Sequence, residues 1–171
     1  RFIDLHDLGD MQVGARFGDP LMDIESYTLT YPGAEEFLRD LNLGKVKKAD
    51  YAGKSAAVIG GGNTAIDAAR TLLRLGAKEV FLVYRRTRDE MPANAEEIDE
   101  AFKEGVVPYF LCAPQAITGK GKVEELVCKR CALGDFDKSG RRRPIPVDGT
   151  EFALKVDFVV PAIGQAAELT G

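Results

Sequence analysis

A short run of small residues has the composition and spacing that could hold the phosphates of a dinucleotide: Gly60, Gly61, Gly62, Asn63, Thr64 and Ala65. The run fits the pattern G-x-G-x-x-G/A. In that pattern the first glycine makes a tight turn, the second lets a pyrophosphate approach the backbone, and the last small residue lets the next helix pack closely. The free N–H groups at the start of that helix would face the phosphates. The alternative is a glycine turn without a ligand.

A basic run follows the next expected strand, at the position that distinguishes NAD from NADP. An NAD site needs Asp or Glu there to accept a hydrogen bond from the ribose 2′-hydroxyl. The chain instead has Arg85, Arg86 and Arg88, and Glu79 stands too far back, at the start of the strand. Guanidinium groups pair with a 2′-phosphate, which a carboxylate would repel. The sequence therefore predicts an NADP(H) site, with a solvated basic loop as the alternative.

The elements that must position these residues alternate between strands and helices. Apolar runs predict strands at 56–59, 80–84, 106–112 and 158–163. Helical periodicity predicts helices at 34–42, 64–75 and 92–104. Short loops between strands and helices in this order imply a parallel sheet with right-handed crossovers.

Prolines and glycines sharpen the expected boundaries. Pro92 is expected in the first turn of the last helix, with Ala95 and Ile98 facing inward and Gly105 at its end. Pro108 cannot donate to a strand ladder, which predicts an edge strand. Residues 45–54 are expected to be a polar connector.

A different pattern begins near residue 123. Extended segments are expected at 123–133, 142–147 and 152–156, with a turn at 137–140 and no helix between them. This is typical of antiparallel strands. The expected fold is therefore α/β: a Rossmann-like NAD(P)-binding fold, in which a parallel sheet carries an inserted antiparallel β-meander.

Composition argues against several classes of protein. The 171 residues are 45% apolar and 29% charged, which is typical of a globular domain and not of a disordered or fibrous chain. A net charge of −4 argues against a nucleic acid or a membrane surface as partner, and no apolar run is long enough to cross a membrane. Three cysteines and one histidine favour a reducing cytoplasm, and we expect no metal site and no catalytic side chain.

Several motifs in combination resemble the NADP(H)-binding domain of the glutamate synthase small (beta) chain family. This is a family of FAD-dependent pyridine nucleotide oxidoreductases whose relatives include dihydropyrimidine dehydrogenase. The resemblance covers about residues 34–165 and is carried by the residues at 60–70, 83–86, 90–93, 140–144 and 161–165.

The resemblance implies a site and a reaction. NADPH would bind at 60–64, its 2′-phosphate at the three arginines, and the backbone of Ala162, Ile163 and Gly164 would pass near the nicotinamide. In the family, hydride passes to FAD, and electrons leave through iron–sulfur clusters in another domain or subunit.

The resemblance also implies how the chain is divided. Residues 1–50 are expected to be an N-terminal segment and connector that belongs to or leads from a flanking FAD domain, 51–165 the NADP(H)-binding domain, and 166–171 the truncated start of the FAD domain. FAD is expected in the full-length protein but not in this fragment, which would be inactive alone. The alternative is a non-catalytic NADP(H)-binding or sensing module.

Two further sets of residues are interpreted structurally. Cys128 and Cys131 form a C-x-x-C pair, but no second pair completes a four-thiolate site, so we expect two ordinary strand cysteines. Asp67, Arg70 and Arg74 have helical spacing and are expected to form an exposed row of ion pairs. Docking of Asp67 or Arg70 against the flavin domain is the alternative.

Overall fold

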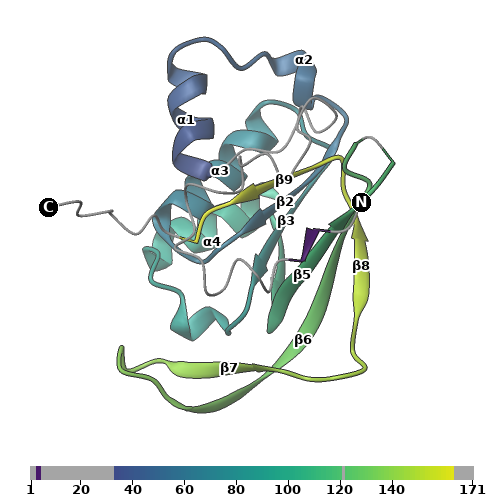
Figure 1. Ribbon diagram of the computed structural model, residues 1–171. Helices are drawn as coiled ribbons and strands as arrows, with labels where there is room; N and C mark the ends of the chain where they lie inside the picture. The colour runs from purple at the N-terminus through teal and green to yellow at the C-terminus, as the bar shows by residue number, and fades with distance from the viewer. Residues whose placement is uncertain (1–2, 5–32, 121, 164–171) are drawn as a thin grey trace, which may run out of the picture.

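The structure, a computed structural model, describes residues 3–4, 33–120 and 122–163. Within these residues the chain forms three layers (Figure 1). A parallel sheet lies in the middle. One face is covered by helices and the other by an antiparallel sheet, so the middle sheet contributes to two apolar cores.

The parallel sheet has four strands in the order β4-β3-β2-β9. They are β2 (Ser55–Ile59), β3 (Glu79–Tyr84), β4 (Val107–Phe110) and β9 (Phe158–Pro161). Neighbouring strands are parallel throughout, which confirms the predicted sheet. Among the strands that the structure describes, β4 pairs with β3 alone, so Pro108 lies on an edge strand as predicted.

Within the described residues, the strands are accompanied by the helices α1 (Ala34–Asn42), α2 (Lys48–Tyr51), α3 (Asn63–Arg74) and α4 (Ala95–Glu104) and by the 3-10 turn η2 (Arg88–Glu90). The predicted helix at 34–42 is confirmed, and α3 differs from its prediction by one residue at each end. The prediction of a connector at 45–54 is wrong in part, because α2 lies within it. Tyr51 of α2 is buried between the rings of Phe37 and Phe158, with centroid distances of 5.7 and 4.9 Å.

The start of α4 also differs from its prediction. Pro92 precedes the helix, and Asn94 caps it by accepting a hydrogen bond from the Glu96 N–H at 2.9 Å. A polar side chain that bonds an otherwise unpaired N–H is a stronger start signal than the proline. Ala95 is therefore exposed and not inward, whereas Ile98 is buried and Gly105 ends the helix with φ of 112°, both as predicted.

The antiparallel sheet consists of β5 (Cys112–Thr118), β6 (Glu125–Phe136), β7 (Arg142–Pro146) and β8 (Phe152–Lys155), with the short β1 (Ile3–Asp4) on the other edge of β5. Both β7 and β8 pair with β6, so the predicted meander is confirmed. The prediction of one strand over 106–112 is wrong at its end. Leu111 has φ of 53°, and the chain turns there, so Cys112 joins the second sheet.

The alternation of side chains along β2 explains the two cores. Ala56 and Val58 face the helices, while Ala57 and Ile59 face the antiparallel sheet. Because successive strand residues point to opposite faces, a strand covered on both sides is apolar throughout. Helix α1 shares the core on the helical side, whereas the domain boundary at residue 51 stays a prediction. The carboxyl ends of β2 and β3 are thereby held side by side.

Candidate functional site

The glycine turn after β2 begins at a position that excludes any side chain. Gly60 has φ of 146°, and a Cβ atom built there would lie 2.4 Å from the carbonyl oxygen of Ala162. The Gly60 N–H donates to the Val83 carbonyl at 3.0 Å, and the Ala162 N–H donates to the Ile59 carbonyl at 2.6 Å. The tight turn expected of Gly60 is therefore present, and it is packed between β3 and the segment that leaves β9.

The next two glycines have different surroundings. A Cβ atom at Gly61 would lie 2.6 Å from the ring of Tyr84, so this ring packs directly against the turn. A Cβ atom at Gly62 would have no atom within 4 Å. Of these three glycines, Gly62 therefore faces open space, which is what the approach of a phosphate to the backbone requires.

Helix α3 starts directly after this open position. Gly62 is its N-cap and provides no side chain to bond the first N–H groups, and no acidic residue lies in the first turn. The N-terminus of α3 therefore carries a partial positive charge that no carboxylate of its first turn offsets. Ala65 is fully buried against the strands, as its small size predicts.

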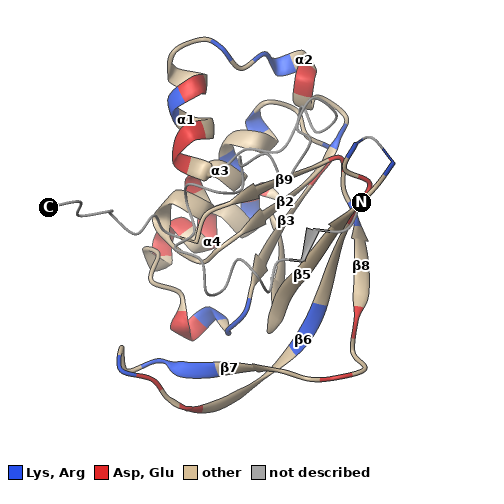
Figure 2. Cartoon of the chain, viewed as in Figure 1, with Lys and Arg blue, Asp and Glu red and all other residues tan. Residues whose placement is uncertain are grey.

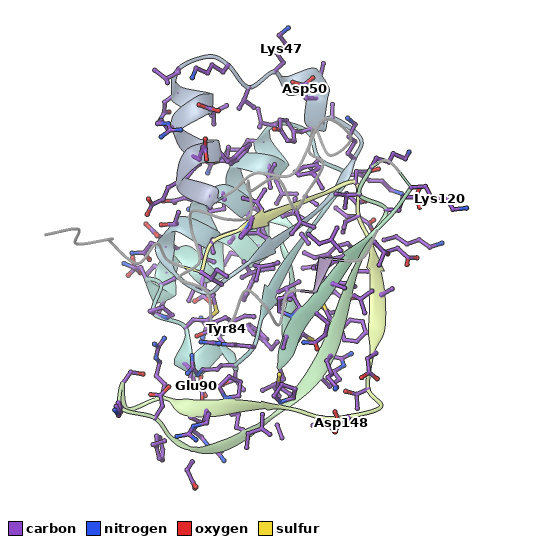
Figure 3. The ribbon with its side chains drawn as sticks, in the orientation of Figure 1. Lys47, Asp50, Tyr84, Glu90, Lys120 and Asp148 are labelled. Atoms are coloured by element: carbon purple, nitrogen blue, oxygen red, sulfur yellow. The ribbon has the colours of Figure 1, made fainter. Side chains whose placement is uncertain are left out.

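The segment after β3 is tied to the glycine turn. Asn94 N–H donates to the Asn63 side-chain oxygen at 2.9 Å, and the Ala93 N–H donates to the Gly61 carbonyl at 3.2 Å. The Tyr84 hydroxyl donates to the Glu90 carbonyl at 2.8 Å, and the two residues lie close together at the end of β3 (Figure 3). Sequence analysis did not single out Tyr84 or Asn94 for this role.

A capping box shapes the same segment, residues 85–94, which we call the arginine loop. Thr87 and Glu90 bond each other reciprocally around η2. The hydrogen bond from the Thr87 hydroxyl lowers the pKa of Glu90, aided by the Thr87 N–H, so this carboxylate stays ionised. The spacing Thr-x-x-Glu is a signal that sequence analysis could have used.

The three arginines that were expected at the 2′-phosphate have three different environments. Arg85 is exposed, and no carboxylate pairs with it among the described residues. Arg86 is only 4% exposed; its Nη2 lies 2.6 Å from Asp137 Oδ2 and its Nε donates to the Arg142 carbonyl at 2.7 Å. Arg88 forms an exposed ion pair with Asp99. Of these three arginines, Arg85 is therefore the one whose guanidinium forms no ion pair with a described carboxylate.

The electrostatic environment of Arg85 is positive. Its side chain reaches solvent, but partial desolvation lowers its pKa, and the nearby charges of Arg86 and Arg141 lower it further. A guanidinium nevertheless remains charged in proteins. An unpaired cation beside like charges is a suitable place for an anion.

Residues 162–164, which were expected near the nicotinamide, are described only in part. Ala162 packs against the helical core and Ile163 is 51% exposed, while Gly164 lies outside the described residues. Ala162 contacts the glycine turn through the close approach of its carbonyl oxygen to Gly60. The structure therefore brings the first of these residues to the turn.

The predicted ion-pair row along α3 is wrong. Arg70 and Arg74 both pair with Glu104 at the end of α4, at 2.6 and 3.3 Å, and not with Asp67. The bond from Arg70 lowers the pKa of Glu104. The reason is tertiary, because packing of α3 on α4 presents a carboxylate that is 34 residues from Arg70 in the sequence.

The cysteines are buried thiols. Cys128 and Cys131 lie on β6, and burial raises the pKa of Cys128 to about 12. Within residues 33–120 and 122–163, no group of three or more His, Cys, Asp or Glu side chains could hold a metal ion. Among the same residues, no helix is long and apolar enough to cross a membrane.

Residues 24–171 match the family described as pyridine nucleotide-disulphide oxidoreductase, and the chain belongs to this family. It is 54% identical over 147 residues to the NADP(+)-dependent formate dehydrogenase subunit beta of Moorella thermoacetica, a match that covers 85% of this chain and 20% of the relative. It is 41% identical over 117 residues to the glutamate synthase [NADPH] small chain of Azospirillum brasilense, covering 68% of this chain and 24% of the relative. The resemblance to the glutamate synthase small chain family is thereby confirmed.

Solved structures confirm the fold. FprA of Mycobacterium tuberculosis in complex with NADPH has a TM-score of 0.56 at 24% identity, covering 68% of this chain and 40% of that one. Thioredoxin reductase of Lactococcus lactis has a TM-score of 0.52 at 24% identity, covering 68% of this chain and 33% of that one. The Rossmann-like fold is therefore shared with these proteins.

Proposed function

We propose that this chain binds NADP(H) across the carboxyl ends of β2 and β3 and presents the nicotinamide to an FAD held elsewhere in the full-length protein. The observation that carries the proposal is the open space at Gly62, beside the N-terminus of α3. A backbone without a side chain, next to unpaired N–H groups, fits a pyrophosphate.

Each part of the site has a role in this proposal. The bound NADPH supplies a hydride. The turn from Gly60 to Thr64, together with Ala65, binds the pyrophosphate, and Arg85 binds the 2′-phosphate. The backbone of Ala162, Ile163 and Gly164 orients the nicotinamide. These residues bind and orient, and no side chain of this chain has to transfer a proton.

The preference for NADP(H) rests on the arginine loop. Arg85 is free to pair with a 2′-phosphate, whereas Arg86 and Arg88 already pair with Asp137 and Asp99. We therefore assign Arg85 the principal contact and give Arg86 and Arg88 supporting roles. The names of the relatives are consistent with this choice, because they specify NADP or NADPH.

The division of the full protein is part of the proposal. The chain spans 20% of the first two relatives, which leaves ample sequence for an FAD domain and for iron–sulfur clusters in the full-length protein. Residues 51–165 would form the NADP(H)-binding domain, with 1–50 and 166–171 leading to the FAD domain. A cytoplasmic location agrees with the three free thiols.

Calorimetric titration with NADPH and NADH tests the cofactor assignment. NADPH should bind more tightly, and Arg85→Ala should weaken NADPH by about tenfold or more while leaving NADH nearly unchanged. Arg39→Ala, an exposed arginine on α1, is the matched control. Equal losses of affinity for both cofactors would mean that Arg85 does not contact the 2′-phosphate.

The division of labour is tested by activity. The 171-residue chain should bind NADPH, remain colourless and fail to reduce ferricyanide with NADPH, because hydride transfer needs an acceptor held within about 3–3.5 Å. Joining the chain to its FAD domain should restore both the yellow colour and the activity. Retention of FAD by the chain alone would contradict the proposed division, and NADPH binding without restored activity would favour the sensing module.

A further inference from the structure

The turn between β6 and β7, residues 137–141, lies against the arginine loop although about 50 residues separate the two segments. Arg86 joins them, since its guanidinium bonds Asp137 Oδ2 at 2.6 Å and the Arg142 carbonyl at 2.7 Å. These two contacts flank Arg141 in the sequence. Figure 2 shows basic residues on both the arginine loop and β7, at the same end of the molecule.

The turn is ordered by its own hydrogen bonds. Asp137 Oδ1 accepts from the Ser139 N–H at 2.8 Å, from the Ser139 hydroxyl at 2.5 Å and from the Arg141 N–H at 3.3 Å. The Arg141 Nε donates to the Ser139 hydroxyl at 3.0 Å. The backbone of Arg141 is therefore held in place, and one edge of its guanidinium is used within the turn.

The ion pairs of this region leave several of its cations without a carboxylate. Three carboxylates of this region are engaged: Asp137 by Arg86, Asp99 by Arg88, and Glu90 by Thr87. Arg142 donates to the carbonyl oxygens of Leu133 and Gly134. Among the described residues, no carboxylate pairs with Arg85 or with Arg141. The positive charge of Arg141 lowers the pKa of Arg85, so the two guanidinium groups repel each other.

We propose that Arg85 and Arg141 together form the binding site for the 2′-phosphate, with Arg141 contributed by the turn between β6 and β7. This inference rests on the proposed function and adds a residue to it. A phosphate dianion placed between the two cations would remove their repulsion and accept hydrogen bonds from both. Arg86 and Asp137 act as positioning residues, because they hold the turn against the arginine loop.

The assignment gives the meander a part in cofactor choice. The glycine turn binds what NADH and NADPH share, so its contribution is common to both cofactors. Arg141 would touch only the group that NADH lacks. Removal of Arg141 should therefore change the preference between the cofactors and leave the binding of NADH unchanged.

Binding of NADPH, NADH and 2′,5′-ADP to the full chain tests this inference. Arg141→Ala should weaken NADPH and 2′,5′-ADP by about tenfold or more and leave NADH unchanged. Arg141→Lys should restore part of the loss, since it keeps the charge but not the two-pronged geometry. Arg143→Ala removes the same charge from an exposed position on β7 and should bind all three ligands as the wild type does.

The outcomes separate this inference from the proposed function. If Arg85→Ala loses NADPH affinity and Arg141→Ala does not, Arg141 has no role and the proposed function stands. An equal loss for NADPH and NADH in Arg141→Ala would show a general effect on the fold and would overturn the inference. If the wild-type chain binds neither cofactor, the proposed function fails and the inference fails with it.

Discussion

The glycine turn after β2 and the arginine loop after β3 follow neighbouring parallel strands but are built on different physical grounds. The glycine turn depends on the absence of side chains, because backbone and ring atoms occupy the space beside Gly60 and Gly61. The arginine loop depends on side chains, since caps and ion pairs give adjacent arginines different environments. A turn that requires glycines can be recognised from the residue types alone. A loop whose shape depends on ion pairs cannot, because the partners of those pairs can be distant in the sequence.

The largest expected effect is on stability at the glycine turn. Gly60→Ala should reduce the free energy of unfolding by about 2–4 kcal/mol, because the new Cβ meets the Ala162 carbonyl and the backbone has φ of 146°. Gly62→Ala is the matched control and should stay within about 0.5 kcal/mol of the wild type, since its Cβ has free space. Urea denaturation measures both. Similar losses in the two variants would contradict the assigned difference.

A smaller effect is expected in the arginine loop. Arg86→Ala should reduce the free energy of unfolding by about 1.5–2 kcal/mol, because it removes two hydrogen bonds of a buried guanidinium that joins two segments. Arg88→Ala removes an exposed ion pair and should cost less than about 1 kcal/mol. The two arginines are close in sequence, so thermal or urea unfolding of the pair isolates burial as the cause. Equal costs would mean that burial does not distinguish them.

A third prediction separates binding from stability in the glycine turn. Gly62→Ala should weaken both NADPH and NADH by about tenfold or more, because a methyl group would fill the space proposed for the pyrophosphate. Calorimetry of both cofactors measures this. The contrast with Arg85→Ala, which should affect NADPH alone, tests whether the two regions read different parts of the ligand. An unchanged affinity in Gly62→Ala would place the phosphates elsewhere.

The smallest effect concerns acid. Hydrogen bonds from Ser139, above all from its hydroxyl, and from the Arg141 N–H lower the pKa of Asp137 from 3.8 to about 2. As the pH falls below 3.8, Asp137 becomes protonated in the unfolded chain but stays ionised in the folded chain until about pH 2. The free energy of unfolding should therefore fall as the pH falls through this window. Asp137→Asn should show a shallower loss, and Ser139→Ala an intermediate one. Urea midpoints between pH 2 and 5 measure the slopes, and equal slopes in all three proteins would contradict the assigned bonds.

Much of the fold could be predicted because its signals are local. Strands β2, β3 and β9 are apolar runs since both of their faces are covered, and α1 and α3 have helical periodicity. The errors occurred where a partner or a cap decides the structure. Residues 48–51 of the expected connector form a helix, because Tyr51 packs on Phe37 and Phe158. Helix α4 starts after Asn94 and not at Pro92, because the Asn94 side chain caps its first turn.

Local patterns in the sequence are sufficient to predict the parallel sheet, the glycine turn and the arginines at the position where a carboxylate would select NAD. Those features depend on residue type and near neighbours, so a local pattern is sufficient. Only tertiary packing buries Arg86 on Asp137 and places the turn bearing Arg141 beside Arg85, which pairs with no carboxylate in the part of the chain that the structure describes. The physical reason is that desolvation and ion pairing depend on which surfaces meet, and packing of the antiparallel sheet brings together residues that are about 50 positions apart.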